Sequence, residues 1–178
     1  MDKGDEDNGR VAKLAAALVS LHAERRKEFA LPVEGRSMGP ALGPSCEVLV
    51  RPMEGMPRFG DVVLFRRKND LVVHRVIGRT RTPAPSVITK GDLYRERDEP
   101  VAPGDIMGRV VGVRRNGQLW GPWQWKRPFS TLAALLSWLE AAGGPRIGYL
   151  LHRIHWQWHL VWLNLTRQVS EKEKAHDR

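Results

Sequence analysis

A serine, a histidine and two aspartates are the residues of this sequence whose types could support chemistry together. Ser37 lies in the segment Gly-Arg-Ser-Met-Gly-Pro, where the glycines allow a sharp turn that presents a hydroxyl. His74 follows in a Val-rich segment, and Asp92 and Asp98 come after it. These are the parts of an acyl-transfer site, because an imidazole can take the hydroxyl proton while a carboxylate holds the imidazole. We therefore consider a serine nucleophile with a histidine base.

The serine segment also matches another nucleophile pattern. Gly-x-Ser-x-Gly is typical of the α/β-hydrolase elbow, which needs a strand before the serine and a helix after it. Pro40 and Pro44 follow Ser37 closely, and a helix cannot run through them. That fold also places an acid between the serine and a late histidine. We reject this alternative.

The histidine lies in a segment that reads as a strand. Alternation places His74 on one face with Val72 and Val76, and places Val73 and Arg75 on the other. A histidine in such a strand is more commonly a core or interface residue than a base. Its role therefore depends on the elements around it.

Those elements indicate a mainly β fold. Runs rich in Val, Leu and Ile begin at Leu31 and are separated by turns containing Gly and Pro. The turns are too short for crossover helices, so the sheet should be mainly antiparallel. The predicted strands cover residues 47–51, 61–66, 71–78, 86–90 and 106–114.

Helices are expected on either side of the strands. Apolar residues at three- and four-residue steps predict a helix over 11–29, and a second helix is predicted over 130–142, before a Gly-Gly-Pro break. A final helix follows in the Trp-rich end. We divide the chain into an N-terminal helical segment (1–30), a catalytic β domain (31–118) and a Trp-rich helical C-terminal extension (119–178).

Five ordered segments between residues 33 and 113 resemble the boxes of type I signal peptidases. They are 35–40, 60–63, 73–76, 89–92 with Asp98, and 108–112. Histidine where bacterial members carry lysine resembles the endoplasmic-reticulum and archaeal branch. The resemblance implies an antiparallel signal-peptidase-like β domain and a serine endopeptidase that cleaves a precursor peptide or protein.

The resemblance also implies a role for each site residue. Ser37 would be the nucleophile and His74 the general base. Asp92 and Asp98 would be the two acidic positions that support the site, and the sequence leaves open which of them orients His74. Since these residues need no cofactor and no metal, we expect none.

Support for the oxyanion is expected from the turn around the nucleophile. Some relatives carry a hydroxyl two residues before the serine, but Gly35 stands there in this chain. Arg36 and Met38 flank Ser37, so we expect backbone N–H groups of this turn, helped by Arg36, to serve instead.

A lysine is the base in self-cleaving repressors of the same superfamily. Lys68 and Lys90 are the lysines nearest to His74, but neither replaces it. We predict that Lys90 is a solvated charge at the end of a strand.

Charge and composition limit the partners. The 29 Lys and Arg outnumber the 20 Asp and Glu, giving a formal net charge of +9, which suits nucleic acid, anionic membrane or acidic protein segments. No nucleic-acid-binding motif is present, so no nucleic acid is expected. Cys46 is the only cysteine, which excludes an intramolecular disulfide and a cysteine-based zinc site. The expected partner is a protein or peptide substrate bound in extended form.

A cytoplasmic location, with peripheral membrane contact, is the expectation for the chain. The acidic first ten residues contain no apolar run and do not read as a signal peptide. The segment 11–29 is charged and only half apolar, unlike the anchor of membrane signal peptidases. Residues 147–165 come closest to a membrane span but contain Arg153 and three histidines.

The Trp-rich end carries an apolar stripe within residues 145–168. We interpret the stripe first as a core or partner face, and second as a face for peripheral membrane contact because tryptophans and basic flanks suit anionic lipid. We interpret its flanking histidines as polar boundary residues because no acidic residue lies near them to orient metal ligands.

Two other functions fit the same sequence. One is a catalytically inactive peptide- or membrane-binding module that keeps the β fold, for which Ser37 and His74 would be dispensable. The other is a regulator that cleaves only itself, although no DNA-binding pattern precedes the β domain.

The membrane interpretation predicts that the C-terminal segment is needed for lipid binding. The whole chain should float with anionic liposomes on a density gradient, and a chain without residues 145–178 should not, because the tryptophans and basic flanks would be lost. If neither chain floats, membrane contact through this segment is wrong.

Overall fold

The computed structural model contains seven named strands and one named helix within its described residues. All six strand pairings are antiparallel, which confirms the mainly β fold predicted from the sequence. The structure describes residues 27–39, 42, 46–68, 70–81, 84–115, 118–120, 127–143, 148–149, 151, 153–154 and 157.

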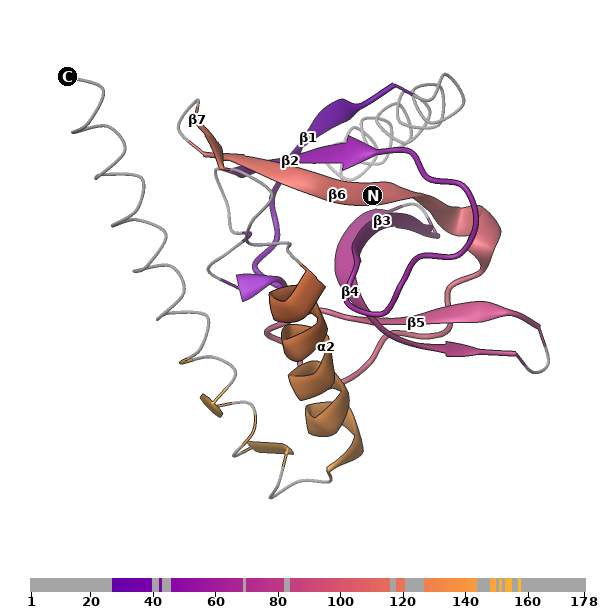
Figure 1. Cartoon of the computed structure of the whole chain (residues 1–178), viewed down its shortest axis with the longest axis vertical. Coiled ribbons are helices and arrows are strands. Elements are labelled where there is room, and N and C mark those ends of the chain that lie inside the picture. Colours follow the sequence, from indigo (N-terminus) through magenta and orange to yellow (C-terminus); the bar gives the residue numbers. More distant parts are fainter. Residues whose placement is uncertain are drawn as a thin grey trace, which may run out of the picture.

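The strands form one sheet in the order β1-β2-β6-β3-β4-β5, with β7 pairing to β6. The sheet bends sharply through β3 and β4 (Figure 1). The strands are β1 (Phe29–Val33), β2 (Cys46–Arg51), β3 (Val62–Arg67), β4 (Asp70–Thr80), β5 (Ser86–Lys90), β6 (Ile106–Arg115) and β7 (Gln118–Trp120). The 3₁₀ turn η2 (Pro103–Asp105) leads into β6, and the helix α2 (Arg127–Ala142) follows the sheet.

The five predicted strands correspond closely to β2, β3, β4, β5 and β6. The first strand, β1, was not predicted. The helix predicted over 11–29 is wrong at its end, since Lys27 and Glu28 are not helical and Phe29 begins β1. Phe29 is buried opposite Val50 of β2, and this burial outweighs the helical pattern before it. Residues 1–26 lie outside the described residues. The short β7 was not predicted, although the Asn-Gly before it is typical of a hairpin.

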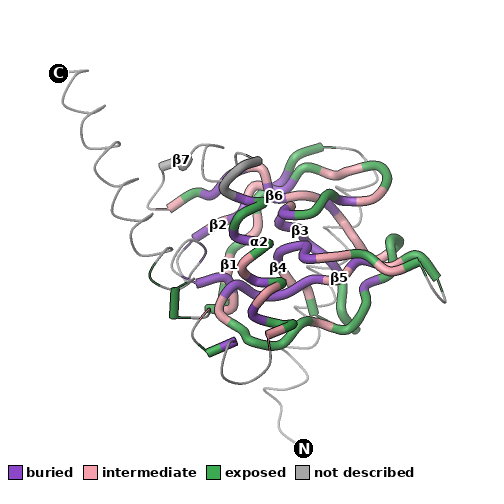
Figure 2. The backbone as a smooth tube through the Cα atoms, turned by 60° about the horizontal axis from the view of Figure 1, so that its bottom comes forward, coloured by how far each residue is buried: buried purple, intermediate pink, exposed green. Residues whose placement is uncertain are grey.

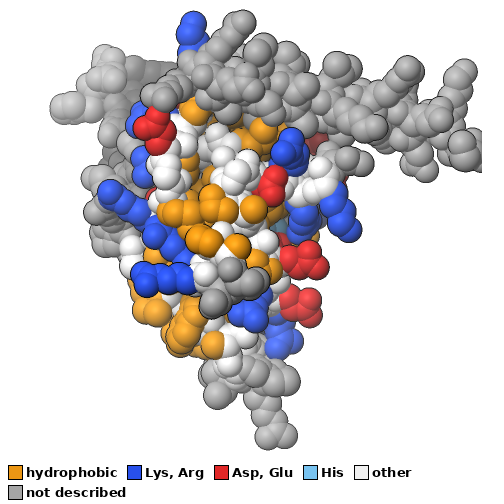
Figure 3. Space-filling view, turned by 90° about the vertical axis from the view of Figure 1, so that its right-hand side faces the viewer, with side chains coloured by type: hydrophobic (Ala, Val, Ile, Leu, Met, Phe, Trp, Pro, Cys, Tyr) orange, Lys and Arg blue, Asp and Glu red, His pale blue; other side chains and the backbone are white. Residues whose placement is uncertain are grey.

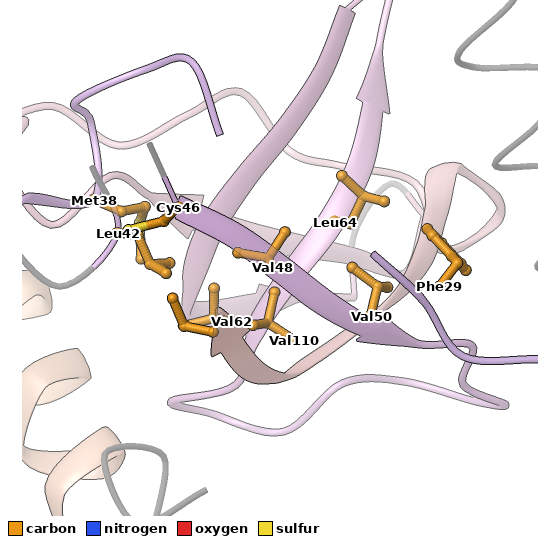
Figure 4. Close-up of a cluster of buried hydrophobic side chains, with 10 residues drawn as sticks. Phe29, Met38, Leu42, Cys46, Val48, Val50, Val62, Leu64 and Val110 are labelled. Atoms are coloured by element: carbon orange, nitrogen blue, oxygen red, sulfur yellow. The ribbon is translucent and has the colours of Figure 1, made fainter. Parts of the chain in front are cut away.

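The apolar core lies on both faces of β3. Its residues Val62 and Leu64 belong to one cluster of buried side chains, and Val63 and Phe65 belong to a second. A strand covered on both faces is apolar throughout, which explains the Val-Val-Leu-Phe run. Figure 4 shows the first cluster. In Figure 2 the buried segments gather in the middle of the molecule, around β3 and β4.

The two-residue alternation predicted for β4 is confirmed. Val73 packs against the first cluster, whereas Val72 and Val76 pack with the second. His74 lies directly opposite Val63 of β3 and is buried on that second face. Strand β3 therefore fixes where His74 points.

Helix α2 packs against β4 (Figure 1). It begins three residues before the predicted start, and Pro128 falls in its first turn, where proline is tolerated. Ala133, Ala134 and Glu140 lie on its buried face, whereas Trp138 is exposed. The next helix predicted from the sequence falls mostly outside the described residues, as do the three histidines beside the apolar stripe.

Charged side chains of both signs surround a central group of hydrophobic ones on the face seen in Figure 3. Basic residues are therefore interspersed with acidic ones on this face. Among the described residues, no helix is both long enough and apolar enough to cross a membrane.

Gly108 provides a test of the packing between β2, β6 and β3. A Cβ at this position would lie 2.7 Å from the carbonyl oxygen of Arg51 and 2.7 Å from Cγ1 of Val50. Gly108→Ala should therefore lower the free energy of unfolding by about 1–3 kcal/mol, because neither neighbour can move without disturbing the core. Urea denaturation measures the change.

The matched control is Gly104→Ala in η2, where a Cβ would meet no atom within 4 Å. It should leave the free energy of unfolding nearly unchanged. Equal losses in the two variants would contradict the tight packing at Gly108.

Candidate active site

Gly91 is the contact point that brings Ser37 and His74 together. A Cβ on Gly91 would lie 3.0 Å from Nε2 of His74, 3.0 Å from Cβ of Ser37 and 2.9 Å from the Ser37 carbonyl oxygen. The Nε2 atom of His74 and the Cβ of Ser37 are therefore no farther apart than the sum of the first two distances. The chain reaches this arrangement because only a hydrogen atom fits at position 91.

The loop after β5 also holds the serine turn in place. The backbone N–H of Leu93 donates to the carbonyl oxygen of Ser37 at 2.8 Å. Inside the turn, the N–H of Gly39 donates to the carbonyl oxygen of Arg36 at 3.0 Å, and Gly39 has a φ of +71°, which favours glycine. The turn and the loop thus hold Ser37 beside the end of β4.

A carboxylate lies on the other side of the histidine ring. Nδ1 of His74 is 2.6 Å from Oδ2 of Asp98, and the two side chains are 2% and 8% exposed. An ionised carboxylate can only accept, so Nδ1 carries the proton of this hydrogen bond. In the neutral ring Nε2 is then an unprotonated acceptor on the side of Ser37.

Further contacts fix Asp98 and the ring. The hydroxyl of Thr89 donates to the same Oδ2 at 2.7 Å, and Arg67 donates to Oδ1 at 3.3 Å. The rings of Phe65 and Tyr94 meet His74 edge-on, with centroids 6.2 and 6.0 Å away. The imidazole is therefore held by two T-shaped aromatic contacts and by a hydrogen bond at Nδ1.

The pKa of Asp98 reflects this environment. Burial of the carboxyl raises its pKa, but the hydrogen bond from His74 and the charge of that ring lower it, and the Thr89 hydroxyl and the Arg67 guanidinium lower it further. The net result is a pKa below the ordinary value of 3.8. Asp98 is thus ionised at neutral pH, as a partner for an imidazolium must be.

The second aspartate, Asp92, contacts a different residue. Its two oxygens accept from Nε and Nη2 of Arg75 at 2.9 and 2.7 Å, and both side chains are buried. Because Arg75 follows His74 on β4, this pair lies on the opposite face of the strand. The sequence left open which of the two aspartates contacts His74. In the structure Asp98 contacts the imidazole, whereas Asp92 binds Arg75.

The two residues that flank Ser37 differ in their surroundings. Met38 is buried in the first core cluster and forms an isolated β-bridge to Leu42. Arg36 is exposed to solvent. Met38 therefore anchors the turn through its buried side chain.

The prediction of a solvated Lys90 is wrong. Its side chain is 0% exposed, and Nζ lies 2.6 Å from Oε2 of Glu140 on α2, which is also 0% exposed. The ammonium is buried because a carboxylate from α2 covers it.

Thr89 and Arg67 were not identified as site residues from the sequence, although both bond to Asp98. For Thr89 a signal existed. Two-residue alternation in β5 places it on the same face as Val87, and this pattern could have indicated a buried hydroxyl there. Nothing in the pattern around Arg67 distinguished it from the neighbouring Arg66.

A cavity of about 620 Å³ opens beside Ser37 and His74. The cavity lies between the edges of β1 and β4 and is lined mainly by apolar side chains. They include Leu31 and Val33 of β1, Leu64 of β3, and Leu71 and Val73 of β4. Strand β1 pairs only with β2, and β5 pairs with β4 only from Arg75 onward. In the described structure, no strand therefore pairs with the facing edges of β1 and of the first half of β4.

These features support nucleophilic and acid–base chemistry at Ser37. Among the described residues, no three His, Cys, Asp or Glu side chains are grouped as metal ligands would be. Comparison with protein-family models, curated proteins and solved structures finds no match for this chain. Function must therefore be inferred from the geometry of the site.

The lowered pKa of Asp98 predicts a pH-dependent contribution to stability. A carboxyl whose pKa is lower in the folded than in the unfolded state stabilises fully above the unfolded value, and this stabilisation is lost as pH falls through the folded value. The difference in free energy of unfolding between the native chain and Asp98→Asn should be constant above about pH 5 and should shrink below pH 3.8. Urea titrations from pH 7 to pH 2 measure it.

Asp105→Asn is the matched control, because its pair with Arg66 is well exposed to solvent. Such pairs contribute little to stability. A pH-independent difference for Asp98→Asn would contradict the ionised, hydrogen-bonded state assigned to Asp98.

Proposed function

We propose that this chain is a serine endopeptidase of the signal-peptidase type. The observation that carries the proposal is the contact at Gly91, which brings Nε2 of His74 beside Ser37 while Nδ1 bonds to Asp98. A buried histidine with a core role would need a partner for its ring, but it would need no serine at the other nitrogen. Serine, histidine and aspartate in this order are the arrangement that activates a hydroxyl.

The first chemical step follows from these positions. Nε2 of His74 takes the proton of the Ser37 hydroxyl as the oxygen attacks the carbonyl carbon of a peptide bond. The imidazolium that forms is stabilised by the ionised Asp98 at 2.6 Å. Backbone N–H groups of the turn at Ser37 and Met38 would face the developing oxyanion.

The second half of the reaction uses the same groups in reverse. His74 gives its proton to the leaving amine, the C–N bond breaks, and the acyl group remains on Ser37. A water molecule then loses a proton to His74 and attacks the ester, which releases the carboxylic acid and restores the Ser37 hydroxyl. No electron acceptor or metal is needed for this balance.

The shape of the cavity favours an extended peptide as substrate. The facing edges of β1 and of residues 70–74 lie on either side of it, and a strand placed between them could bond to both. Alternate side chains of that peptide would then meet the apolar surface made by Leu31, Leu64 and Leu71. The substrate class we propose is a precursor peptide or protein with an extended, apolar segment at the cleavage site.

The central experiment compares variants on a peptide library by mass spectrometry. Ser37→Ala and His74→Ala should each lower kcat/KM at least about 10³-fold, because the two groups act as a unit. Asp98→Asn should lower it by on the order of 10²–10⁴, because the imidazolium loses its charge partner.

Two controls separate chemistry from folding. Ser86→Ala removes an exposed hydroxyl that donates to the nearby Ala84 carbonyl, and should keep full activity. Asp92→Asn should instead lower the free energy of unfolding by about 3–5 kcal/mol, since it leaves the buried Arg75 poorly paired.

The rival function is a peptide-binding module without chemistry. It predicts that peptides bind in the cavity but are not cleaved, and that Ser37→Ala binds them as well as the native chain. Cleavage that survives in both Ser37→Ala and His74→Ala would exclude the proposed pair.

A further inference from the structure

Helix α2 is joined to the strands beside the site by two buried polar contacts. Near its start, Ser130 Oγ accepts from Nη1 of Arg75 at 2.9 Å and donates to the carbonyl oxygen of Gly60. Near its end, the carboxylate of Glu140 accepts from Nζ of Lys90 at 2.6 Å, with both side chains fully buried. The helix therefore contacts β4 and β5 through polar side chains at separate points.

Each strand residue in these contacts is adjacent in the chain to a site residue. Arg75 follows His74, and Lys90 precedes Gly91. Ser130 and Glu140 are ten residues apart, which is about 15 Å along a helix. One rigid element thus reaches both backbone segments that hold the reacting side chains.

Lys90 faces away from the reacting atoms. Its neighbour Thr89 bonds to Asp98, so alternation directs Lys90 to the other side of β5, toward α2. Lys90 also approaches the carbonyl oxygen of Gly91, at 3.5 Å. Its effect on the site therefore passes through the backbone of Gly91.

Burying an ammonium and a carboxylate is costly, and such pairs often give no more stability than two apolar residues of similar size. The pair does restrict geometry, because separating the two groups leaves an unpaired charge in the interior. Gly91 needs such a restriction, since a Cβ built on it would lie only about 3 Å from atoms of Ser37 and His74. A small shift of β5 would open that contact.

We infer that Lys90 and Glu140 are positioning residues: their buried ion pair fixes the end of β5 on α2 and holds the Gly91 backbone against Ser37 and His74. This inference rests on the proposed function for its effect on catalysis. Its effect on the local structure can be measured without any activity.

The test uses the full chain with the double variant Lys90→Met/Glu140→Leu, which keeps apolar packing, and the single variant Glu140→Gln. Amide hydrogen exchange by NMR reports on the Leu93 N–H, which donates to Ser37. In the double variant this amide should exchange at least about tenfold faster, because opening of the loop costs less free energy. The Val76 N–H, bonded to Asp61, is the reference that should not change.

Peptide cleavage provides the second readout. At a temperature where the double variant is fully folded, kcat should fall at least about tenfold with KM within about twofold, because the reacting groups are displaced while the peptide still binds. If Glu140→Gln alone does not fold, the kcat and KM of the double variant are the values that test the inference.

Ser137→Ala is the matched control. Ser137 lies on the same buried face of α2, and its hydroxyl has no hydrogen-bond partner in the described structure. This variant should keep the native exchange rate at Leu93 and the native kcat.

A double variant with native exchange at Leu93 and native kcat would overturn the positioning role. A purely stabilising pair would instead change the melting temperature and leave the kcat of the folded protein unaltered, which also contradicts the inference. If the native chain cleaves no peptide, the proposed function is lost, and the exchange rate at Leu93 alone decides whether the pair positions the loop.

Discussion

The arrangement of the site depends on one steric constraint, which is the lack of a side chain at Gly91. Backbone and side-chain atoms of Ser37 and the Nε2 atom of His74 lie about 3 Å from where a Cβ would be. The segments that contain Ser37, His74 and Gly91 are far apart in the sequence. They can meet at this point because Gly91, which lies between the other two, contributes only backbone atoms. Two hydrogen bonds then hold the three segments in one geometry: the Leu93 N–H donates to the Ser37 carbonyl oxygen, and Nδ1 of His74 donates to Asp98.

Strand β4 separates two kinds of charge pair by its two-residue alternation. On one face His74 bonds to Asp98 and is open to Ser37. On the other face Arg75 and Asp92 form a bidentate pair that is closed off by Ser130 of α2. Neighbouring residues thus differ in role: in the proposed reaction the first pair exchanges a proton, whereas the second keeps a permanently charged guanidinium hydrogen-bonded in the interior.

Much of the sheet could be predicted because its strands are apolar runs bounded by Gly and Pro. The face of His74 could also be predicted, since it depends only on local alternation. The choice between Asp92 and Asp98 could not, because both lie in one loop and the choice depends on how that loop folds over β4. Lys90 was misread for a similar reason: a lysine at a strand end is usually solvated, and its partner Glu140 comes 50 residues later in the chain.

The position of β6 between β2 and β3 has a consequence for how the chain acquires its structure. Strands β1 and β2 can pair as soon as they are made, and β3, β4 and β5 can form a meander by themselves, but no strand pairing joins these two units until β6 is present. Ser37 belongs to the first unit and His74 to the second. During synthesis, the two halves of the site therefore stay unconnected by the sheet until the ribosome has released residues beyond 115, and a nascent chain shorter than this lacks the framework that aligns them.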